Sequence, residues 1–69
     1  MGYDEVIYIV QQYVAGEMRY WCFHHGGESD PKIKEYISAS PYTTSLEDII
    51  ETAKDMQFGS HAGIWFVDI

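Results

Sequence analysis

Hydrophobic residues near the start of the chain form two segments rich in β-branched and aromatic side chains. Val6 to Tyr13 reads VIYIVQQY, and Met18 to His24 reads MRYWCFH. Such residues fit a pleated, half-buried surface better than the crowded surface of a helix. Gly16, between the two segments, supplies the positive φ that a tight hairpin commonly requires. The pattern therefore predicts two antiparallel strands joined by a hairpin turn over residues 14–17.

The next stretch is polar and ends in an ambiguous segment. Residues 26–31 concentrate glycine, proline and small polar residues, which predicts a loop. Residues 32–39 allow two interpretations. Three apolar residues at helical spacing favour a short helix after Asp30-Pro31: Ile33, Tyr36 and Ile37. We favour a third strand instead, because a further meander strand makes the sheet wide enough to be stable. Pro41 ends whichever element precedes it.

A helix is predicted from residue 44 onward. Thr44-Ser45-Leu46-Glu47 is a capping-box pattern, in which a hydroxyl accepts from an early backbone N–H and the carboxylate reaches back to the cap. Apolar residues then recur at three- and four-residue steps and form one stripe: Leu46, Ile49, Ile50, Ala53 and Met56. Gly59 follows the stripe as the expected C′ residue.

The chain as given closes on a short aromatic and branched segment, residues 62–69 (AGIWFVDI), which predicts a last strand. With 69 residues we expect a single domain spanning 1–69. The fold class expected is α+β, in two layers. One helix packs on an antiparallel sheet of three or four strands, in the order β-β-β-α-β.

One helix covers only one face of such a sheet, yet alternate strand positions place large side chains on both faces. Tyr20, Trp21 and Trp65 are the candidate residues of an apolar interface. An exposed apolar patch usually marks an interaction surface, which predicts a homodimer or a protein partner. The alternative is that the long segment 25–44 folds over this second face.

The charge balance changes the choice of partner. Eleven acidic residues against four basic ones give a net charge of −7 and a pI near 4.5. This opposes direct binding to nucleic acid or to anionic membranes, so we expect a protein with a cationic surface as the partner. Cys22 is the single cysteine, and no signal-peptide pattern or apolar run of about 20 residues is present. We therefore expect a cytoplasmic protein.

Four residues of zinc-ligand type are present: Cys22, His24, His25 and His61. Structural zinc sites favour ligand pairs at two separate places, whereas here one ligand-dense spot is combined with a single distant histidine. A Cys–His nucleophile pair could be built from the same residues, but a mid-strand thiol is more often a small hydrophobic filler. We expect no metal, no cofactor and no enzymatic activity.

The acidic residues form one unusual pattern. Glu47, Glu51 and Asp55 stand at successive four-residue steps, which places three carboxylates in a column along one helix face. Four residues rise about 6 Å, a spacing similar in scale to phosphates along a nucleic-acid strand. Asp48 lies beside the column. We expect partner binding to run through these four residues, with a second candidate cluster in the preceding segment: Glu28, Asp30 and Glu35. The alternative is an ordinary solvated helix face on an acidic protein.

The two opening strands, the capped helix within TTSLEDIIETAK and the closing aromatic strand make a tiny acidic domain. In this architecture the chain resembles small phage-encoded proteins, including several anti-CRISPR families. The resemblance covers about the last third of the chain, and it assigns no functional residue of those families to a position in this sequence. It implies binding to a CRISPR effector and blocking of its nucleic-acid groove. The leading hypothesis is thus an acidic inhibitor that mimics nucleic acid, and the alternative is a homodimeric accessory module that uses an aromatic sheet face.

Overall fold

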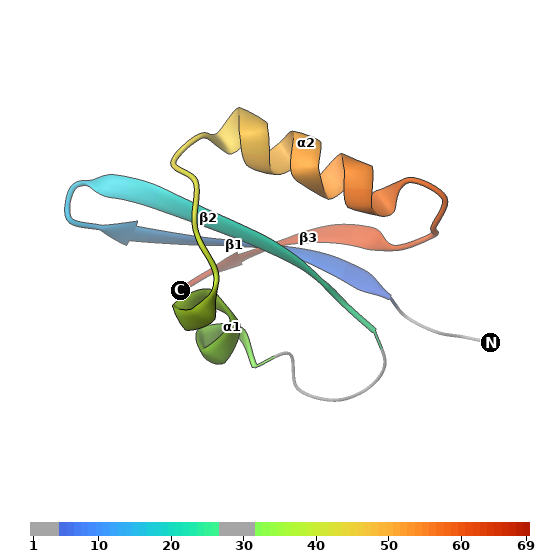
Figure 1. Ribbon diagram of the computed structural model, residues 1–69, viewed down its shortest axis with the longest axis horizontal. Helices are drawn as coiled ribbons and strands as arrows, with labels where there is room; N and C mark the ends of the chain where they lie inside the picture. Colours follow the sequence, from blue (N-terminus) through green and yellow to red (C-terminus); the bar gives the residue numbers. More distant parts are fainter. Residues whose placement is uncertain (1–4, 27–31) are drawn as a thin grey trace.

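Three strands and two helices make up the protein, in the order β1 (Val6–Val14), β2 (Glu17–His25), α1 (Ile33–Ala39), α2 (Leu46–Gln57) and β3 (Gly63–Asp68). The computed structural model describes residues 5–26 and 32–69, and Figure 1 shows the arrangement. The expected α+β class is confirmed. The order of elements differs from the expected β-β-β-α-β in one place, at residues 32–39.

The strands form a mixed sheet in the order β2-β1-β3. β1 pairs with β2 antiparallel from Val6 opposite His25 to Val14 opposite Glu17. β3 instead pairs with β1 in parallel, so the prediction of a wholly antiparallel sheet is wrong. Parallel neighbours need a long crossover between them. Here both helices lie between β2 and β3, and they return the chain to the end of the sheet where β1 begins.

The predicted hairpin is confirmed, with a two-residue turn. Ala15 (φ 55°) and Gly16 (φ 81°) both adopt left-handed backbone conformations. Positive φ at both central residues is the property of a type I′ turn, whose twist matches that of the flanking strands.

β1 is the central strand and is buried on both faces. Ile7, Ile9 and Val10 are the largest side chains that are almost completely buried. Ile7 and Ile9 face one side of the sheet and Val10 faces the other, where they join two separate hydrophobic clusters. The apolar run in β1 therefore contributes side chains to both hydrophobic clusters.

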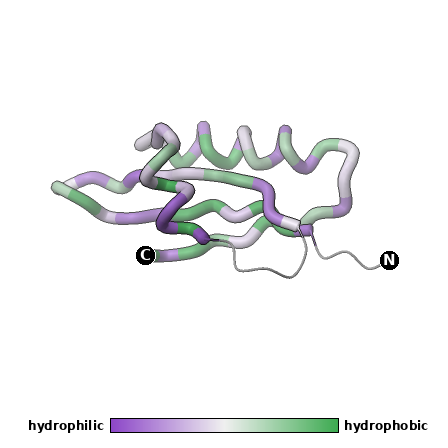
Figure 2. Tube along the Cα trace, turned by 60° about the horizontal axis from the view of Figure 1, so that its bottom comes forward, coloured by the Kyte–Doolittle hydropathy of each residue, from purple (hydrophilic) through white to green (hydrophobic). Residues whose placement is uncertain are grey.

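α2 covers one face of the sheet, mainly over β1 and β2. Its predicted apolar stripe points at the sheet, where Ile49 and Ala53 are buried against Ile7, Ile9 and Tyr20. Figure 2 shows hydrophilic and hydrophobic positions alternating along the helix. Leu46, at the first turn, is the member of the stripe that stays largely exposed.

α1 lies on the opposite face, and the prediction of a strand over 32–39 is wrong. Ile33 and Ile37 pack against the second cluster, which contains Trp21 and Phe23. The Tyr36 ring stacks on Phe23 with centroids 4.3 Å apart. A helix brings these three positions to one side, whereas a strand would send Tyr36 away from the two isoleucines. The segment leading to α2 thus covers part of the second face, as the alternative interpretation held.

The chain between the helices is fastened to β2. Trp21 Nε1 donates a hydrogen bond to the Ser40 carbonyl at 3.1 Å. Tyr20 and Thr43 exchange two backbone hydrogen bonds, of 2.8 and 3.0 Å, along the outer edge of β2. The molecule is elongated, with extents of 42 × 23 × 17 Å. Neither helix of the described residues is long and apolar enough to cross a membrane.

Candidate functional site

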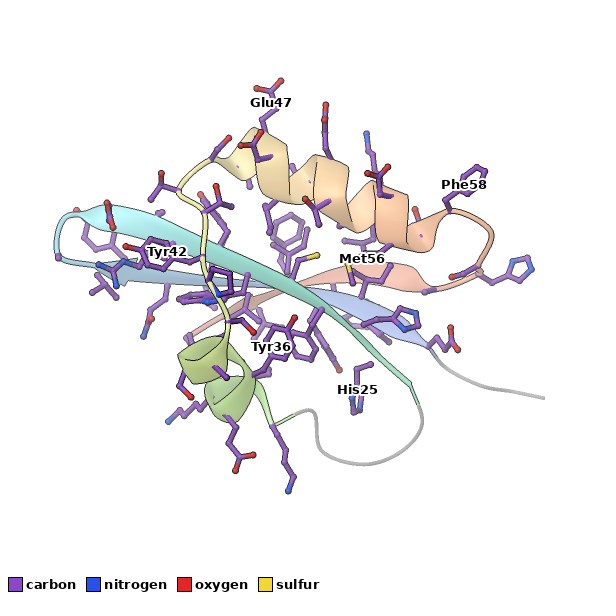
Figure 3. The ribbon with its side chains drawn as sticks, viewed as in Figure 1. His25, Tyr36, Tyr42, Glu47, Met56 and Phe58 are labelled. Carbon is purple, nitrogen blue, oxygen red and sulfur yellow. The ribbon has the colours of Figure 1, made fainter. Side chains whose placement is uncertain are left out.

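The acidic column stands on the solvent side of α2. Glu47, Asp48, Glu51 and Asp55 are all exposed, and in Figure 3 Glu47 points away from the sheet. At 3.6 residues per turn these four positions fall within about 100° of arc, nearly opposite the buried stripe. The same periodicity that fixes the helix to the sheet therefore directs the carboxylates into solvent.

The start of α2 is one residue later than the capping box predicted. Ser45, not Thr44, is the N-cap, and its hydroxyl accepts from the Asp48 backbone N–H at 3.1 Å. Glu47 and Asp48 then occupy the first turn, where the helix dipole favours negative charge. Gly59 follows the helix with a φ of 79°, as expected for a C′ residue.

The carboxylates of the column lack a cationic partner in the described part of the chain. In that part Arg19 pairs with Glu17 at 3.0 Å, and His24 Nε2 lies 3.3 Å from a carboxylate oxygen of Glu5. Lys54 is the one basic residue of α2, and it lies in the last turn. Like charges at four-residue spacing cost about 0.2–0.5 kcal/mol per pair. The column is thus a local cost to helix stability.

The three other basic residues lie outside α2. Lys32 and Lys34 belong to the α1 segment, on the other face of the sheet. Arg19 already has two partners within the chain. Its guanidinium lies over the Tyr42 ring, 4.4 Å from the ring centroid, and it also pairs with Glu17. The α2 side is therefore the acidic side of the described molecule.

Of the second predicted cluster, the structure describes Glu35, and this residue lies apart from the column on α2. Glu35 is exposed on α1, so one flat partner surface could not contact it together with α2. Glu28 and Asp30 lie outside the described residues.

The three aromatic residues of the predicted apolar interface have different surroundings. Tyr20 and Trp21 are buried, at 8% and 5% exposure, on opposite faces of β2. Trp65 on β3 is 61% exposed. An exposed apolar surface of this chain thus contains Trp65 without the other two. Phe58 and Phe66, which the predicted interface does not include, are 90% and 54% exposed. The alternation along the last strand could have indicated Phe66, whereas nothing in the sequence marks Phe58 as outside the core.

Cys22, His24 and His25 lie on β2, whereas His61 lies in the connection between α2 and β3. Among the described residues no three His, Cys, Asp or Glu side chains are grouped so that they could hold a metal ion. The Cys22 thiol is half-buried and donates to the Met56 sulfur at 3.2 Å. Burial raises the pKa of the Cys22 thiol above its ordinary value. A raised pKa lowers the thiolate fraction at neutral pH, and the thiolate is the nucleophilic form.

Open hollows on the described surface include two with different linings. The larger, about 690 Å³, lies where the α2–β3 connection meets the start of β1, and its lining includes Glu5, His61 and Trp65. The smaller, about 320 Å³, lies between β2 and the 40–43 segment. The lining of the larger hollow also includes Ser60, whose hydroxyl accepts a hydrogen bond from the Ala62 N–H at 3.0 Å, and its Glu5 carboxylate lies 3.3 Å from His24 Nε2.

A scan against protein-family models, a search of curated proteins and a search of solved structures each found no match.

Proposed function

We propose that this protein is a non-catalytic inhibitor that occupies a basic, nucleic-acid-binding surface of a partner protein with the acidic face of α2. The observation that carries the proposal is the column of Glu47, Glu51 and Asp55 on the exposed side of a helix whose other side is packed on the sheet. Because packing fixes the helix, the backbone positions of the carboxylates are set before binding, and only their side chains have to be ordered.

Charge complementarity supports this choice of partner. Surfaces that bind nucleic acid carry Lys and Arg side chains that neutralise successive phosphates. Carboxylates about 6 Å apart along a helix offer such a surface anions at a similar spacing. Like charges in the column repel one another, and α2 carries one lysine, Lys54, to reduce that repulsion. Binding of a cationic partner would offset the repulsion.

The thiol chemistry favours binding over catalysis. The single cysteine sits in mid-strand against Met56, with its thiol pKa raised by burial. A nucleophilic cysteine needs the opposite shift, toward the thiolate.

The resemblance to anti-CRISPR proteins narrows the proposal. On this basis the chain is of phage or mobile-element origin and acts in the host cytoplasm on a CRISPR effector. Its acidic helix face would then occupy the groove that otherwise holds the nucleic acid.

Displacement of DNA from purified effectors tests the proposal. Fluorescence anisotropy of labelled target DNA on each effector of a panel should fall as the protein is added. Glu51→Lys combined with Asp55→Lys should raise the concentration needed about tenfold or more at low salt, since rim charges set the rate and salt dependence of association. The wild-type protein should lose potency as salt rises, and the double variant should respond less.

A matched control separates the helix face from net charge. Glu35→Lys on α1 makes the same change as Glu51→Lys at an exposed helical glutamate on the other face of the sheet. We expect Glu35→Lys to displace DNA like the wild type. Equal potency of Glu51→Lys and Glu35→Lys would show that α2 is not the binding face, and no displacement from any effector would refute the narrower proposal.

A further inference from the structure

The two edges of the sheet differ in how the chain covers them. The outer edge of β2 is bonded to Thr43 through Tyr20, and the Cys22 carbonyl accepts from the Tyr36 hydroxyl at 3.4 Å. β3 pairs with β1 and with no other strand of the described residues. An edge strand of this kind presents a row of backbone donors and acceptors to another chain.

The backbone groups that face outward follow from one hydrogen bond. The Ile69 N–H donates to the Gln11 carbonyl of β1 at 3.1 Å. Successive residues of a strand direct their backbone groups to alternate sides, so position 69 and the other odd positions face β1. Ile64, Phe66 and Asp68 therefore direct their N–H and C=O groups away from the sheet.

The side chains along this edge do not protect it. Natural edge strands are commonly blocked by lysine, proline or a bulge, and Gly63–Asp68 has none of these. Trp65 and Phe66 are exposed on opposite faces of β3, and Ile69 is 41% exposed. The one charged residue, Asp68, accepts a hydrogen bond from Gln11 Nε2 at 2.7 Å.

We infer that β3 pairs antiparallel with β3 of a second copy of this chain, about a two-fold axis at Phe66. In this register the numbers of two facing residues add up to twice 66, so residue 63 of one chain lies opposite residue 69 of the other. All of residues 63–69 are therefore paired. Phe66 then lies opposite Phe66 of the partner subunit. On either side of this central pair, Ile64 of one chain forms a hydrogen-bonded pair with Asp68 of the other. The result is a continuous six-stranded sheet.

Side-chain sizes match in that register. Trp65 faces Val67 of the partner subunit, which pairs a large aromatic with a β-branched residue, a favourable cross-strand combination. Ile69 faces Gly63 of the partner subunit. An added Cβ at Gly63 would lie 3.3 Å from Trp65 Nε1, so the indole already covers that position. The isoleucine would complete an apolar patch there, on the α1 face of the sheet.

The register also suits the charges. Asp68 lies opposite Ile64 of the partner subunit, so no two carboxylates face each other. The acidic column stands on α2, which packs mainly over β1 and β2, away from this edge. Two chains of net charge −7 still repel each other at long range, and salt screens that repulsion. Salt should therefore strengthen this dimer, whereas it weakens binding of the acidic face to a basic partner.

The mass in solution tests the inference. Sedimentation equilibrium from about 1 µM to about 1 mM covers the affinities of weak, transient interfaces. We expect the mass to rise from 8.0 kDa toward twice that value and to stop there. The dissociation constant should fall when salt is raised from about 0.05 to about 0.5 M. A mass fixed at the monomer value, or one that grows past the dimer, would overturn the inference.

Matched lysine variants locate the contact. Phe66→Lys places two like charges opposite each other at the axis and should raise the dissociation constant about tenfold or more. Phe58→Lys makes the same change at an exposed phenylalanine beyond the end of α2, visible in Figure 3, and should dimerise like the wild type. Equal dimerisation of both variants would refute the β3 contact.

A second variant guards against misfolding. Circular dichroism at about 1 µM should give the wild-type spectrum for both lysine variants, since both phenylalanines are exposed. If Phe66→Lys is unfolded, Trp65→Ser serves instead, because it removes the indole from the edge and leaves the buried clusters intact. A folded Trp65→Ser variant that dimerises as tightly as the wild type would contradict the inference.

Discussion

Ala15 is held in a backbone conformation that L-residues with a Cβ rarely adopt. Its φ of 55° precedes Gly16 at 81°, and the pair closes the β1–β2 hairpin. A left-handed residue with a side chain carries a steric cost of about 1–2 kcal/mol, which asparagine partly avoids by hydrogen bonding locally. Gly16 predicts the turn from the sequence, whereas the strain at Ala15 follows from the register, which pairs Val14 with Glu17 and leaves Ala15 as the first of two turn residues.

Replacing Ala15 with Asn should therefore stabilise the protein. We expect a gain of about 1 kcal/mol, equivalent to a rise in Tm of about 4–8 °C for a domain of this size. Thermal unfolding at low protein concentration measures it. Ala39→Asn, at an exposed helical position, is the control and should not raise Tm. Failure of Ala15→Asn to raise Tm would mean that the turn carries no such strain.

Cys22 should make the protein less stable at high pH. Because burial raises the pKa of its thiol in the folded state, the unfolded chain loses that proton at a lower pH than the folded chain does. The stabilising contribution is present below the unfolded pKa, near pH 9, and is lost as pH rises toward the folded value.

Urea unfolding from pH 7 to 10.5 tests this linkage with Cys22→Ala as the reference. The difference in unfolding free energy between wild type and variant should stay constant below about pH 8 and shrink above about pH 9. Because the two proteins share every other residue, contributions from the rest of the chain cancel in this difference. A difference that stays constant through pH 10.5 would show that the thiol is not shielded from water.

At the scale of elements, α2 was predictable and α1 was not. In α2 the cap, the apolar stripe and the terminal glycine all indicate one helix, and the acidic column follows from its periodicity. In the 32–39 segment, Ile33 and Ile37 fit a helix or a strand. The outcome depends on long-range contacts: Thr43 occupies the outer edge of β2, and Trp21 needs cover.

The placement of β3 has a similar explanation. Nothing in AGIWFVDI distinguishes parallel from antiparallel pairing. The continuous apolar run at the start of β1 was the available signal, since it is typical of a strand with neighbours on both sides and cover on both faces. The expected aromatic interface depended on which face stayed open. α2 covers Tyr20 on one face and α1 covers Trp21 on the other, whereas Trp65 on β3 is exposed.

The N-cap of α2 gives a prediction at this scale. Ser45→Ala removes the acceptor for the Asp48 N–H and should lower the unfolding free energy by about 1 kcal/mol. Thr44→Ala, one residue earlier and exposed, should leave it nearly unchanged. Urea unfolding of both variants measures the difference, and a larger loss for Thr44→Ala would move the cap to that residue.

At the scale of the whole molecule, different surfaces carry different properties. The α2 side presents carboxylates, the α1 side carries Lys32 and Lys34, and the β3 edge is apolar. In the inferred dimer the two-fold axis runs perpendicular to the sheet, which puts both α2 helices on the same side. Two acidic columns on one side would bind a long basic groove with the advantage of two linked contacts.

The most direct test of the central claim is to map the surface of this chain that meets a bound partner. An effector whose DNA the protein displaces is titrated into ¹⁵N-labelled protein, and amide shifts and line broadening are followed residue by residue. We predict that the largest changes fall on the exposed positions of α2 between Glu47 and Asp55, and that α1 changes little. Changes concentrated on α1 or on β3, with α2 unaffected, would contradict the claim that the acidic helix face is the binding surface.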